Sequence, residues 1–197
     1  MMVNYFLSFI IGLFFGMMPF SYMLGLLRGV DLRKVGSGNI GATNLGRNLG
    51  PLFFVLGFLL DAFKGVIPVL LSQSLLDSGT LAGAGAILGH IFNPFFGFRG
   101  GKGVATTIGV AATLALKSFA LSIGIWLLIY LTTLLVSLAS LSFAVALPLF
   151  SFIMNEGTIG DRLLFILISI MVFYAHRHNI QRLLNRSEPK TVLWRKK

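Results

Sequence analysis

The chain has 197 residues, of which 56% are hydrophobic and only 11% are charged, and its mean hydropathy is +0.88. A soluble domain carries about a quarter charged residues, so this composition excludes a water-exposed globular protein and indicates a protein embedded in lipid. The formal net charge of +10 then indicates membrane topology and contact with anionic headgroups rather than a nucleic-acid partner, and the absence of cysteine excludes a thioester intermediate and a disulfide framework.

Long apolar runs follow one another along the chain, without the alternation of apolar and polar residues that is typical of a membrane barrel. We therefore predict an all-α, polytopic membrane protein with a single domain over residues 1–197. A helix needs about 20 apolar residues to cross the hydrocarbon core. This predicts about seven transmembrane helices, with five as the fallback because two segments are short. The predicted spans are 3–27, 51–76, 81–98, 104–116, 118–137, 142–154 and 163–176.

Basic residues gather in alternate connections between these spans. Segments 28–50, 99–103 and 177–197 carry thirteen lysines and arginines, whereas the connections on the other side carry only Lys117 and Arg162. Because cytoplasmic loops are enriched in lysine and arginine, this asymmetry predicts that the N-terminus lies outside and that the C-terminus is cytoplasmic.

The first cytoplasmic segment contains a run of glycines and small polar residues from Gly36 to Asn48. Glycine permits positive φ angles and close approach of a ligand to the backbone, and successive amides in such a loop form an anion-binding nest. A flexible interfacial loop or small-residue helix packing also explains the glycines, but Arg47 at the end of the run favours a phosphate site. The candidate ligands are Gly36, Gly38, Asn39, Gly41, Thr43, Asn44 and Arg47.

A second cluster runs from His90 to Gly100-Gly101-Lys102-Gly103. A lysine between glycines at a membrane surface suits a phosphate, since its ammonium group is a compact charge on a flexible stem. His90 lies about 12 Å of helix from the predicted cytoplasmic edge, where ionisable groups are functional or tightly partnered. A neutral histidine that is hydrogen-bonded between helices is an equally good explanation. The candidate ligands here are His90, Gly101, Lys102 and Gly103.

The third cluster lies at the C-terminal end of the last predicted span. His176, Asn179 and Arg182 are spaced at i, i+3 and i+6 and therefore share one helix face. A histidine, an amide and a guanidinium on one face can orient a hydroxyl group and hold a phosphate. The alternative is that the basic side chains only snorkel to the interface, which suits Arg177 better than His176.

Two further features receive a structural interpretation. Asp61 and Lys64 stand at i, i+3 within the second predicted span, and an intrahelical ion pair that lowers the cost of insertion is the simpler explanation. Asp61 could also orient a catalytic cation. Residues 187–197 are interpreted as a short basic tail that contacts lipid headgroups.

On the predicted topology, all three clusters share the cytoplasmic side. A water-soluble phosphate ester would there meet backbone amides and several cations, while an apolar chain could arrive from the bilayer. This combination predicts a lipid-synthesising transferase. The alternative is a phosphate-ester transporter or anion channel, which would want basic residues on both faces and is often built from internal repeats. The charge asymmetry and the missing repeats count against it.

The three clusters resemble the signatures of the bacterial PlsY family, the membrane acyl-phosphate:glycerol-3-phosphate acyltransferases, and the resemblance extends along nearly the whole chain. The signatures read Gly36-Ser-Gly-Asn-Ile-Gly-Ala-Thr-Asn44, Gly100-Gly-Lys-Gly-Val-Ala-Thr106 and Ala175-His-Arg-His-Asn-Ile-Gln-Arg182. The family implies seven spans in the bacterial inner membrane, a cytoplasmic active site, no metal and no cofactor. It also implies an acyl phosphate donor, which a peripheral acyltransferase could supply, glycerol 3-phosphate as acceptor and lysophosphatidic acid as product.

Other glycerol-3-phosphate acyltransferases carry an H-x4-D motif, which this chain lacks. Five residues after its three histidines stand Phe95, Gln181 and Leu183. Without a His–Asp base, the donor should be more reactive than a thioester, as a mixed carboxylic–phosphoric anhydride is.

The resemblance leads to a mechanistic hypothesis in which the 1-hydroxyl of glycerol 3-phosphate attacks the acyl carbonyl and inorganic phosphate leaves. The amides of segment 36–44 hold the donor phosphate. Arg47 and Lys102 bind the acceptor phosphate, with Arg182 as a helper. The catalytic residues are Ser37, His176 and Asn179, which orient the hydroxyl. The proton goes to His176 or, as we prefer, to a phosphate oxygen of a substrate; an acyl-enzyme on Ser37 ranks third.

Overall fold

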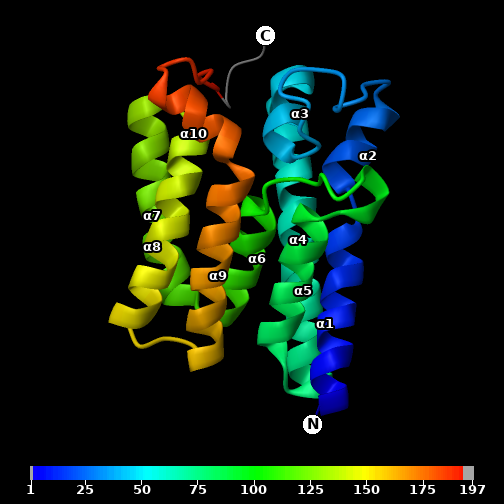
Figure 1. The fold of residues 1–197 in the computed structure, drawn as a ribbon, viewed down its shortest axis with the longest axis vertical. Helices are drawn as coiled ribbons and strands as arrows, with labels where there is room; N and C mark the ends of the chain where they lie inside the picture. Colours follow the sequence, from blue (N-terminus) through cyan, green and yellow to red (C-terminus); the bar gives the residue numbers. More distant parts are fainter. Residues whose placement is uncertain (1, 193–197) are drawn as a thin grey trace. The chain divides into compact units, whose positions relative to one another are not determined.

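The computed structural model describes residues 2–192, and within this range the chain forms α-helices, one 3-10 helix and no strand (Figure 1). The predicted all-α class is therefore confirmed. The elements are α1 (Met2–Met17), α2 (Phe20–Leu27), α3 (Ala42–Leu49), α4 (Pro51–Leu76), α5 (Gly79–Ile91), η1 (Pro94–Phe96), α6 (Val104–Leu114), α7 (Leu116–Thr133), α8 (Val136–Ile153), α9 (Ile159–Ala175) and α10 (Arg177–Leu184).

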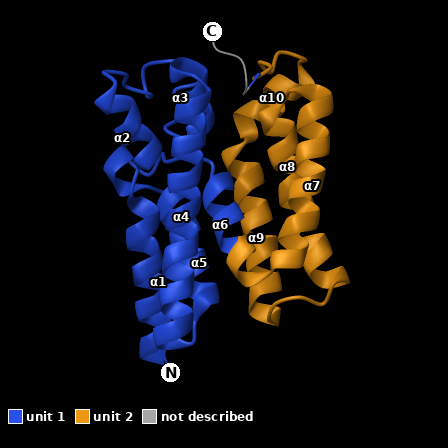
Figure 2. Cartoon of the chain, turned by 180° about the vertical axis from the view of Figure 1, so that it is seen from behind, with its two compact units in different colours: residues 1–110, 192–197 blue, residues 111–191 orange. Residues whose placement is uncertain are grey.

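The helices form two compact units (Figure 2). The first comprises the described chain up to Val110, together with Val192, and holds α1 to α5, η1 and the start of α6. The second is Ala111–Thr191 and holds the end of α6 and α7 to α10. The prediction of a single functional domain remains a prediction.

Small residues allow α1 and α5 to pack closely in the first unit. A Cβ atom on Gly12 would overlap the backbone carbonyl of Ala82, and one on Gly16 would overlap that of Ala86. A Cβ atom on Gly85 would likewise overlap the backbone of α1. The order of these pairs shows that the two helices run parallel, and close backbone approach of this kind is typical of helix packing in membranes.

The first predicted span, 3–27, is divided in the structure. α1 ends at Met17, and α2 begins at Phe20 after Pro19. Proline has no N–H and cannot donate to the helical ladder, so it breaks or kinks a helix. The carbonyl groups at the end of α1 therefore need partners from elsewhere in the first unit.

In the second unit, α8 and α9 pack through buried aliphatic and aromatic side chains. Phe143 and Leu147 of α8 and Phe165 and Ile168 of α9 are 0–1% exposed. The start of α7 is closed by Glu156, whose carboxylate accepts the backbone N–H groups of the first residues of that helix, at 3.0 Å and 2.7 Å. The apolar sequence thus determines the core of this unit, and one acidic side chain closes a helix end.

Each of the seven predicted spans coincides with helical structure, and 51–76 matches α4 to the residue. The third, 81–98, stops being helical at Ile91 and continues as a turn around η1. By length and apolar composition, four helical stretches among the described residues could cross a membrane, or five if the bent pair α9–α10 is one span. The count of seven and the orientation of the termini therefore remain predictions.

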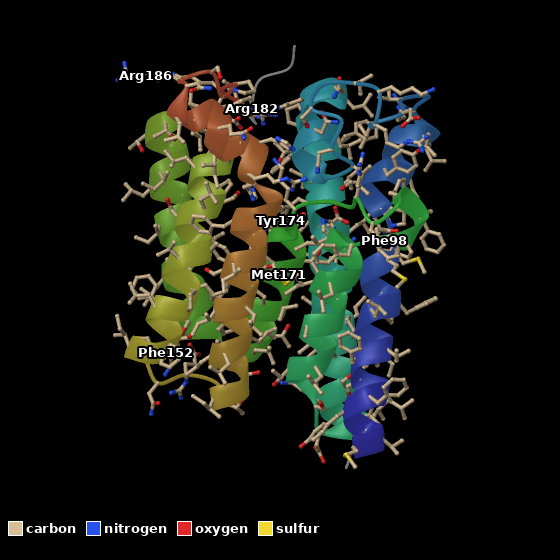
Figure 3. The ribbon with its side chains drawn as sticks, viewed as in Figure 1. Phe98, Phe152, Met171, Tyr174, Arg182 and Arg186 are labelled. Carbon is tan, nitrogen blue, oxygen red and sulfur yellow. The ribbon has the colours of Figure 1, made fainter. Side chains whose placement is uncertain are left out.

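Basic side chains gather at one end of the second unit. Arg182 and Arg186 lie at the α10 end, whereas Phe152 lies at the opposite end of the same unit (Figure 3). Part of the predicted basic tail is packed rather than free: the N–H of Thr191 donates to the Leu134 carbonyl at 2.9 Å. Residues 193–197 of that tail lie outside the described residues.

Candidate active site

The side chain of Asn44 organises the glycine-rich segment of the first unit. Asn44 is buried, and its amide nitrogen donates to the carbonyl groups of Leu32 and Val35, at 3.0 Å and 3.1 Å. The same nitrogen lies 2.9 Å from the Asn39 carbonyl oxygen. Its Oδ1 atom accepts the backbone N–H of Ser37 at 3.0 Å. Asn44, a predicted ligand, therefore shapes the loop from inside.

Two glycines of this segment adopt backbone angles that other residues avoid. Gly36 has φ +58° and Gly38 has φ +69°, both in the left-handed region that favours glycine. A Cβ atom on Gly36 would also overlap the Oδ1 atom of Asn44. The glycines are therefore required by the path of the chain around Asn44, whatever the segment binds.

The structure narrows the set of amides that an anion could use. The backbone N–H groups of Ser37, Gly38 and Gly41 already donate to oxygen atoms of Asn44, Val35 and Asn39, respectively. The segment was predicted to be a loop, but its last residues begin α3, whose N-cap Gly41 offers no side-chain cap. The first N–H groups of a helix lack intrahelical partners and attract anions. The amides of Ala42 and Thr43 are therefore the best placed to bind one.

The second cluster folds back over the end of α5. The N–H of Gly100 donates to the Ile91 carbonyl at 2.9 Å, and the N–H of Gly101 donates to the His90 carbonyl at 3.1 Å. A Cβ atom on Gly101 would overlap the imidazole ring of His90. The buried His90 ring thus supports the backbone that carries Lys102, which agrees with a supporting role and does not require contact with a ligand.

The first two clusters lie together in the first unit. The Asn39 amide nitrogen is 3.5 Å from the Gly100 carbonyl oxygen. The rings of Phe96 and Tyr22 pack edge to face with their centroids 4.9 Å apart. Tyr22 belongs to the buried core that underlies the glycine-rich segment, together with Leu32, Ile40 and Leu45. Phe96 therefore joins the turn around η1 to that core.

The predicted ligands of the first unit differ in their exposure. Ser37 is exposed, whereas Thr43, Arg47 and Lys102 are half-buried. Half-buried cations beside backbone amides suit phosphate oxygens, which accept charge-assisted hydrogen bonds. Within residues 2–192, no group of three or more histidine, aspartate or glutamate side chains could hold a metal ion.

In the second unit, His176 lies at a sharp bend. It joins α9 and α10, which meet at 62°, and it is 2% exposed. Its Nδ1 atom lies 2.8 Å from the Val172 carbonyl oxygen. A carbonyl oxygen can only accept, so Nδ1 carries a proton, and in the neutral ring the lone pair is on Nε2. The bend therefore fixes the tautomer of a histidine that could accept a hydroxyl proton.

Asn179 and Arg182 hold a carboxylate that was not among the predicted site residues. The Asn179 amide nitrogen donates to one oxygen of Glu188 at 2.6 Å, and Nε of Arg182 donates to the other at 2.6 Å. Glu188 is buried, and it is the one acidic residue among the basic residues that follow α9. That isolated acid was the only signal in the sequence that could have revealed it.

The electrostatics around Glu188 favour its charged form. Burial raises the pKa of this carboxyl group, but the hydrogen bonds from Arg182 and Asn179 outweigh it, so that the pKa lies below its ordinary value of 4.5. The carboxylate thus orients both side chains, which were predicted to serve in binding and in orienting the hydroxyl.

Comparison with known proteins identifies what this arrangement of residues is similar to. A family model described as glycerol-3-phosphate acyltransferase matches residues 6–186. A glycerol-3-phosphate acyltransferase from Thermosipho melanesiensis is 40% identical over 190 residues, which cover 96% of this chain and 94% of the relative. One from Aquifex aeolicus is 42% identical over 177 residues, covering 88% and 92%.

Two solved structures have the same fold. Both are crystal structures of PlsY (YgiH), an integral membrane glycerol 3-phosphate acyltransferase. The glycerol 3-phosphate form superposes with a TM-score of 0.90 at 39% identity and covers 95% of this chain and 96% of that one. The lysophosphatidic acid form has a TM-score of 0.88 at 37% identity and covers 96% of both chains.

Proposed function

Since the chain belongs to the family of membrane glycerol-3-phosphate acyltransferases, we propose that it takes its acyl group from an acyl phosphate and transfers it to the 1-hydroxyl of glycerol 3-phosphate. The acylation of glycerol 3-phosphate to lysophosphatidic acid is the activity of the family. The donor, the roles of individual residues and the side of the membrane belong to the proposal.

The choice of an acyl phosphate as donor follows from the weak general base that the chain offers. The H-x4-D pair of other glycerol-3-phosphate acyltransferases is absent, since Gln181 stands five residues after His176. An acyl phosphate compensates for a weak base because its leaving group is a stable phosphate anion. The hydroxyl oxygen attacks the carbonyl carbon, the bond from that carbon to the phosphate oxygen breaks, and inorganic phosphate departs with the electron pair.

Binding of the donor phosphate rests on the start of α3. The amides of Ala42 and Thr43 lie at an uncapped helix N-terminus, where fixed dipoles stabilise charge that develops on a phosphate. This is the observation on which the proposal mainly depends. The half-buried Arg47 and Lys102 then bind the phosphate of the acceptor, with Arg182 as a helper.

The hydroxyl group is oriented by Ser37, His176 and Asn179. The lone pair on Nε2 of His176 suits a proton acceptor, because the Val172 carbonyl holds the proton on Nδ1. A phosphate oxygen of a bound substrate is the other acceptor, and we favour it because two phosphates are present. Ser37 is exposed and its backbone N–H binds Asn44, which supports a role in orientation rather than as a nucleophile.

We place the protein in the bacterial inner membrane with its basic loops in the cytoplasm. Lysines and arginines of connecting segments are distributed thirteen to two between the two predicted sides. Glycerol 3-phosphate then arrives from the cytosol, and a peripheral acyltransferase can deliver acyl phosphate to the same side.

The decisive experiment measures phosphate release from palmitoyl phosphate by the purified protein in lipid, with and without glycerol 3-phosphate. We expect release only when the acceptor is present, together with formation of lysophosphatidic acid. Lys102→Ala should reduce the acceptor-dependent rate by roughly a hundredfold or more, because it removes a charged hydrogen-bond donor from a reacting phosphate ester.

Lys117→Ala is the matched control. Lys117 is an exposed lysine outside the three clusters, and its variant should keep the wild-type rate. If palmitoyl phosphate stays intact while lysophosphatidic acid forms from an acyl thioester, the donor is wrong. If labelled glycerol 3-phosphate instead accumulates inside vesicles without turnover, transport is the better account.

A further inference from the structure

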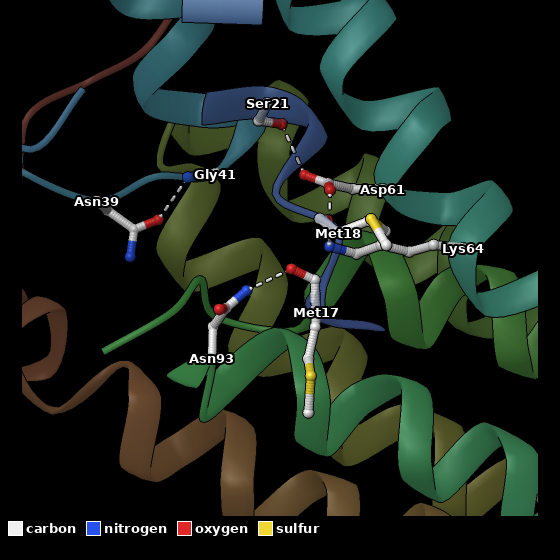
Figure 4. A network of polar contacts seen from close by, with 8 residues as sticks. All are labelled: Met17, Met18, Ser21, Asn39, Gly41, Asp61, Lys64 and Asn93. Carbon is white, nitrogen blue, oxygen red and sulfur yellow. Dashed lines mark hydrogen bonds and ion pairs between the residues drawn. The ribbon is translucent and has the colours of Figure 1, made fainter. Parts of the chain in front are cut away.

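The break between α1 and α2 is held by side chains from two distant parts of the first unit. Two consecutive carbonyl groups, those of Met17 and Met18, face the break (Figure 4). The Asn93 amide nitrogen donates to the Met17 carbonyl oxygen at 2.7 Å, and the Lys64 ammonium group donates to that of Met18 at 2.8 Å. Because the helix is interrupted, the N–H groups of residues 21 and 22 do not reach these two carbonyl groups, and the side chains supply the hydrogen bonds instead.

Lys64 is held in place by Asp61 on the same helix. The ammonium nitrogen lies 3.0 Å from one carboxylate oxygen of Asp61, and the other oxygen accepts the Ser21 hydroxyl at 2.6 Å. Both charged residues are 2% exposed. Neutralising a charge for membrane insertion requires only the pair itself, and apolar residues at both positions would be less costly still. Insertion does not explain why Lys64 also contacts Met18, in the break, or why Asp61 also contacts Ser21, in α2.

The part of α4 next to Asp61 and Lys64 also packs against the glycine-rich segment. Gly57 lies one helical turn before Asp61, and a Cβ atom there would overlap Ser21 and Leu45 and touch Ala42. α3, whose first amides were proposed above to bind the donor phosphate, therefore rests on α4 next to the hydrogen bond between Ser21 and Asp61.

Asn93 links the same break to the segment that carries Lys102. Its Oδ1 atom accepts the N–H of Phe95 at 3.0 Å, so the side chain caps η1 while its nitrogen holds Met17. Gly100 and Gly101 then return to the end of α5 through their backbone N–H groups. Asn93 is 1% exposed, and the turn is fixed at both ends.

From these contacts we infer that Lys64, Asp61 and Asn93 are positioning residues of the acyltransferase, which hold the glycine-rich segment and the Gly100–Gly103 segment in register by pinning both to the α1–α2 break. The inference rests on the proposed function, because it assigns a donor phosphate to one segment and an acceptor phosphate to the other. Each segment keeps its own internal hydrogen bonds when these three side chains are replaced, so each substrate still binds. The relative placement of the two substrates becomes less exact, because only the contact between Asn39 and Gly100 and the packing of Phe96 on Tyr22 still join the two segments.

The test compares two double variants that both remove the buried charges. Asp61→Leu/Lys64→Met is apolar. Asp61→Asn/Lys64→Gln instead retains an amide at position 64 that can donate to the Met18 carbonyl and an amide oxygen at position 61 that can accept the Ser21 hydroxyl. We expect the apolar pair to unfold within a few degrees of the wild type but to lose roughly tenfold or more in kcat, since small misplacements of reacting groups cost this much. KM for both substrates should change by less than about threefold. The amide pair should recover much of kcat.

Ser72→Ala is a control on the same helix and should behave as the wild type. Ser72 is a buried serine about three turns after Asp61 in α4. Wild-type kcat in the apolar pair, or equal loss in both pairs, would overturn the inference and leave Asp61 and Lys64 as an insertion pair. Proportional loss of kcat and of folded protein would do the same. A wild-type protein without acceptor-dependent turnover would instead overturn the proposed function, so the two failures are distinguishable.

Discussion

At the scale of single residues, several buried polar side chains hold the backbone and the side chains of the candidate site in place. Asn44 and Asn93 each hold several backbone groups, and Glu188 holds two side chains that were predicted to serve the substrate. A buried amide or carboxylate with every partner satisfied rigidifies its surroundings. The residues proposed to bind a phosphate are thus supported by others that fix their geometry.

The contacts of Glu188 make the stability of the protein depend on pH. Its pKa is lowered in the folded protein, so its stabilising effect is fully present above its ordinary value of 4.5 and is lost as the pH falls through the folded pKa. Glu188→Gln should therefore lower the free energy of unfolding by roughly 1–3 kcal/mol at pH 7. Unfolding temperatures of the two proteins, measured from pH 7 to pH 3, should converge at the acid end.

Asp77→Asn is the control for this titration, since Asp77 is an exposed acid at a helix end and its replacement should leave the unfolding temperature nearly unchanged. A difference between wild type and Glu188→Gln that persists undiminished at pH 3 would contradict an ionised Glu188 in the folded protein.

The sequence indicated the polar segments of the candidate site, but not the contacts that their individual residues make. The Gly36–Asn44 and Gly100–Gly103 segments were recognisable because several glycines stand there beside asparagine, arginine or lysine, between long apolar runs. The role of Asn44 was not predictable, since its partners are carbonyl groups of Leu32, Val35 and Asn39 and every residue has a carbonyl. Glu188 was missed because its role depends on contacts with Asn179 and Arg182 that no spacing in the sequence indicates.

At the scale of helices, the apolar pattern predicted positions well and ends less well. α4 matched to the residue because Gly50 precedes Pro51, the helix start that such a pair favours, and Asp77 follows in the left-handed conformation. The start of α8 at Val136 was placed six residues too late, at 142, because the serines that open it look like a connection. Ser137 and Ser140 are buried, and the Ser140 hydroxyl donates to the Val136 carbonyl at 2.7 Å, which only the fold reveals.

The contact between α1 and α5 supports a prediction of opposite effects for two glycines. Gly12→Ala places a Cβ atom against the Ala82 carbonyl, so the helices must separate, and we expect a loss of roughly 2 kcal/mol or more. Gly124→Ala in α7 has nothing within 4 Å of the new atom. It should stabilise its helix by about 0.5–1 kcal/mol, because alanine loses less backbone entropy than glycine.

Thermal unfolding of both variants in the same lipid or detergent measures the difference. If Gly124→Ala destabilised the protein as much as Gly12→Ala does, close packing would not be what distinguishes the two glycines. Equal unfolding temperatures for Gly12→Ala and the wild type would contradict the close approach of α1 and α5.

At the scale of the whole molecule, the lipid environment followed from composition, because too few polar residues are present to cover a water-exposed surface. The all-α class followed from apolar runs that do not alternate with polar residues. The family followed from three short signatures. The number of spans did not follow, since α5 and α6 are shorter than a full crossing and only their surroundings decide how they lie in a membrane. Charge distribution supplies the orientation as a prediction that can be tested directly.

The absence of cysteine makes that test simple. Single cysteines introduced as Ser187→Cys and Lys117→Cys occupy exposed positions on opposite predicted sides. A membrane-impermeant maleimide added to intact cells should label Lys117→Cys, whereas Ser187→Cys should react only after the inner membrane is opened. Labelling in the reverse order would invert the topology, and labelling of both positions from outside would contradict the predicted number of crossings.

The pinned break between α1 and α2 also has a consequence for synthesis. The carbonyls of Met18 and Met17 receive their donors from residues 46 and 76 positions further along the chain. The stretch from α1 to α2 therefore leaves the ribosome before Lys64 and Asn93 do. Until then its two carbonyl groups depend on water or lipid headgroups for hydrogen bonds. The end of α1 therefore reaches its final hydrogen bonding only after α4 and the turn around η1 have been made.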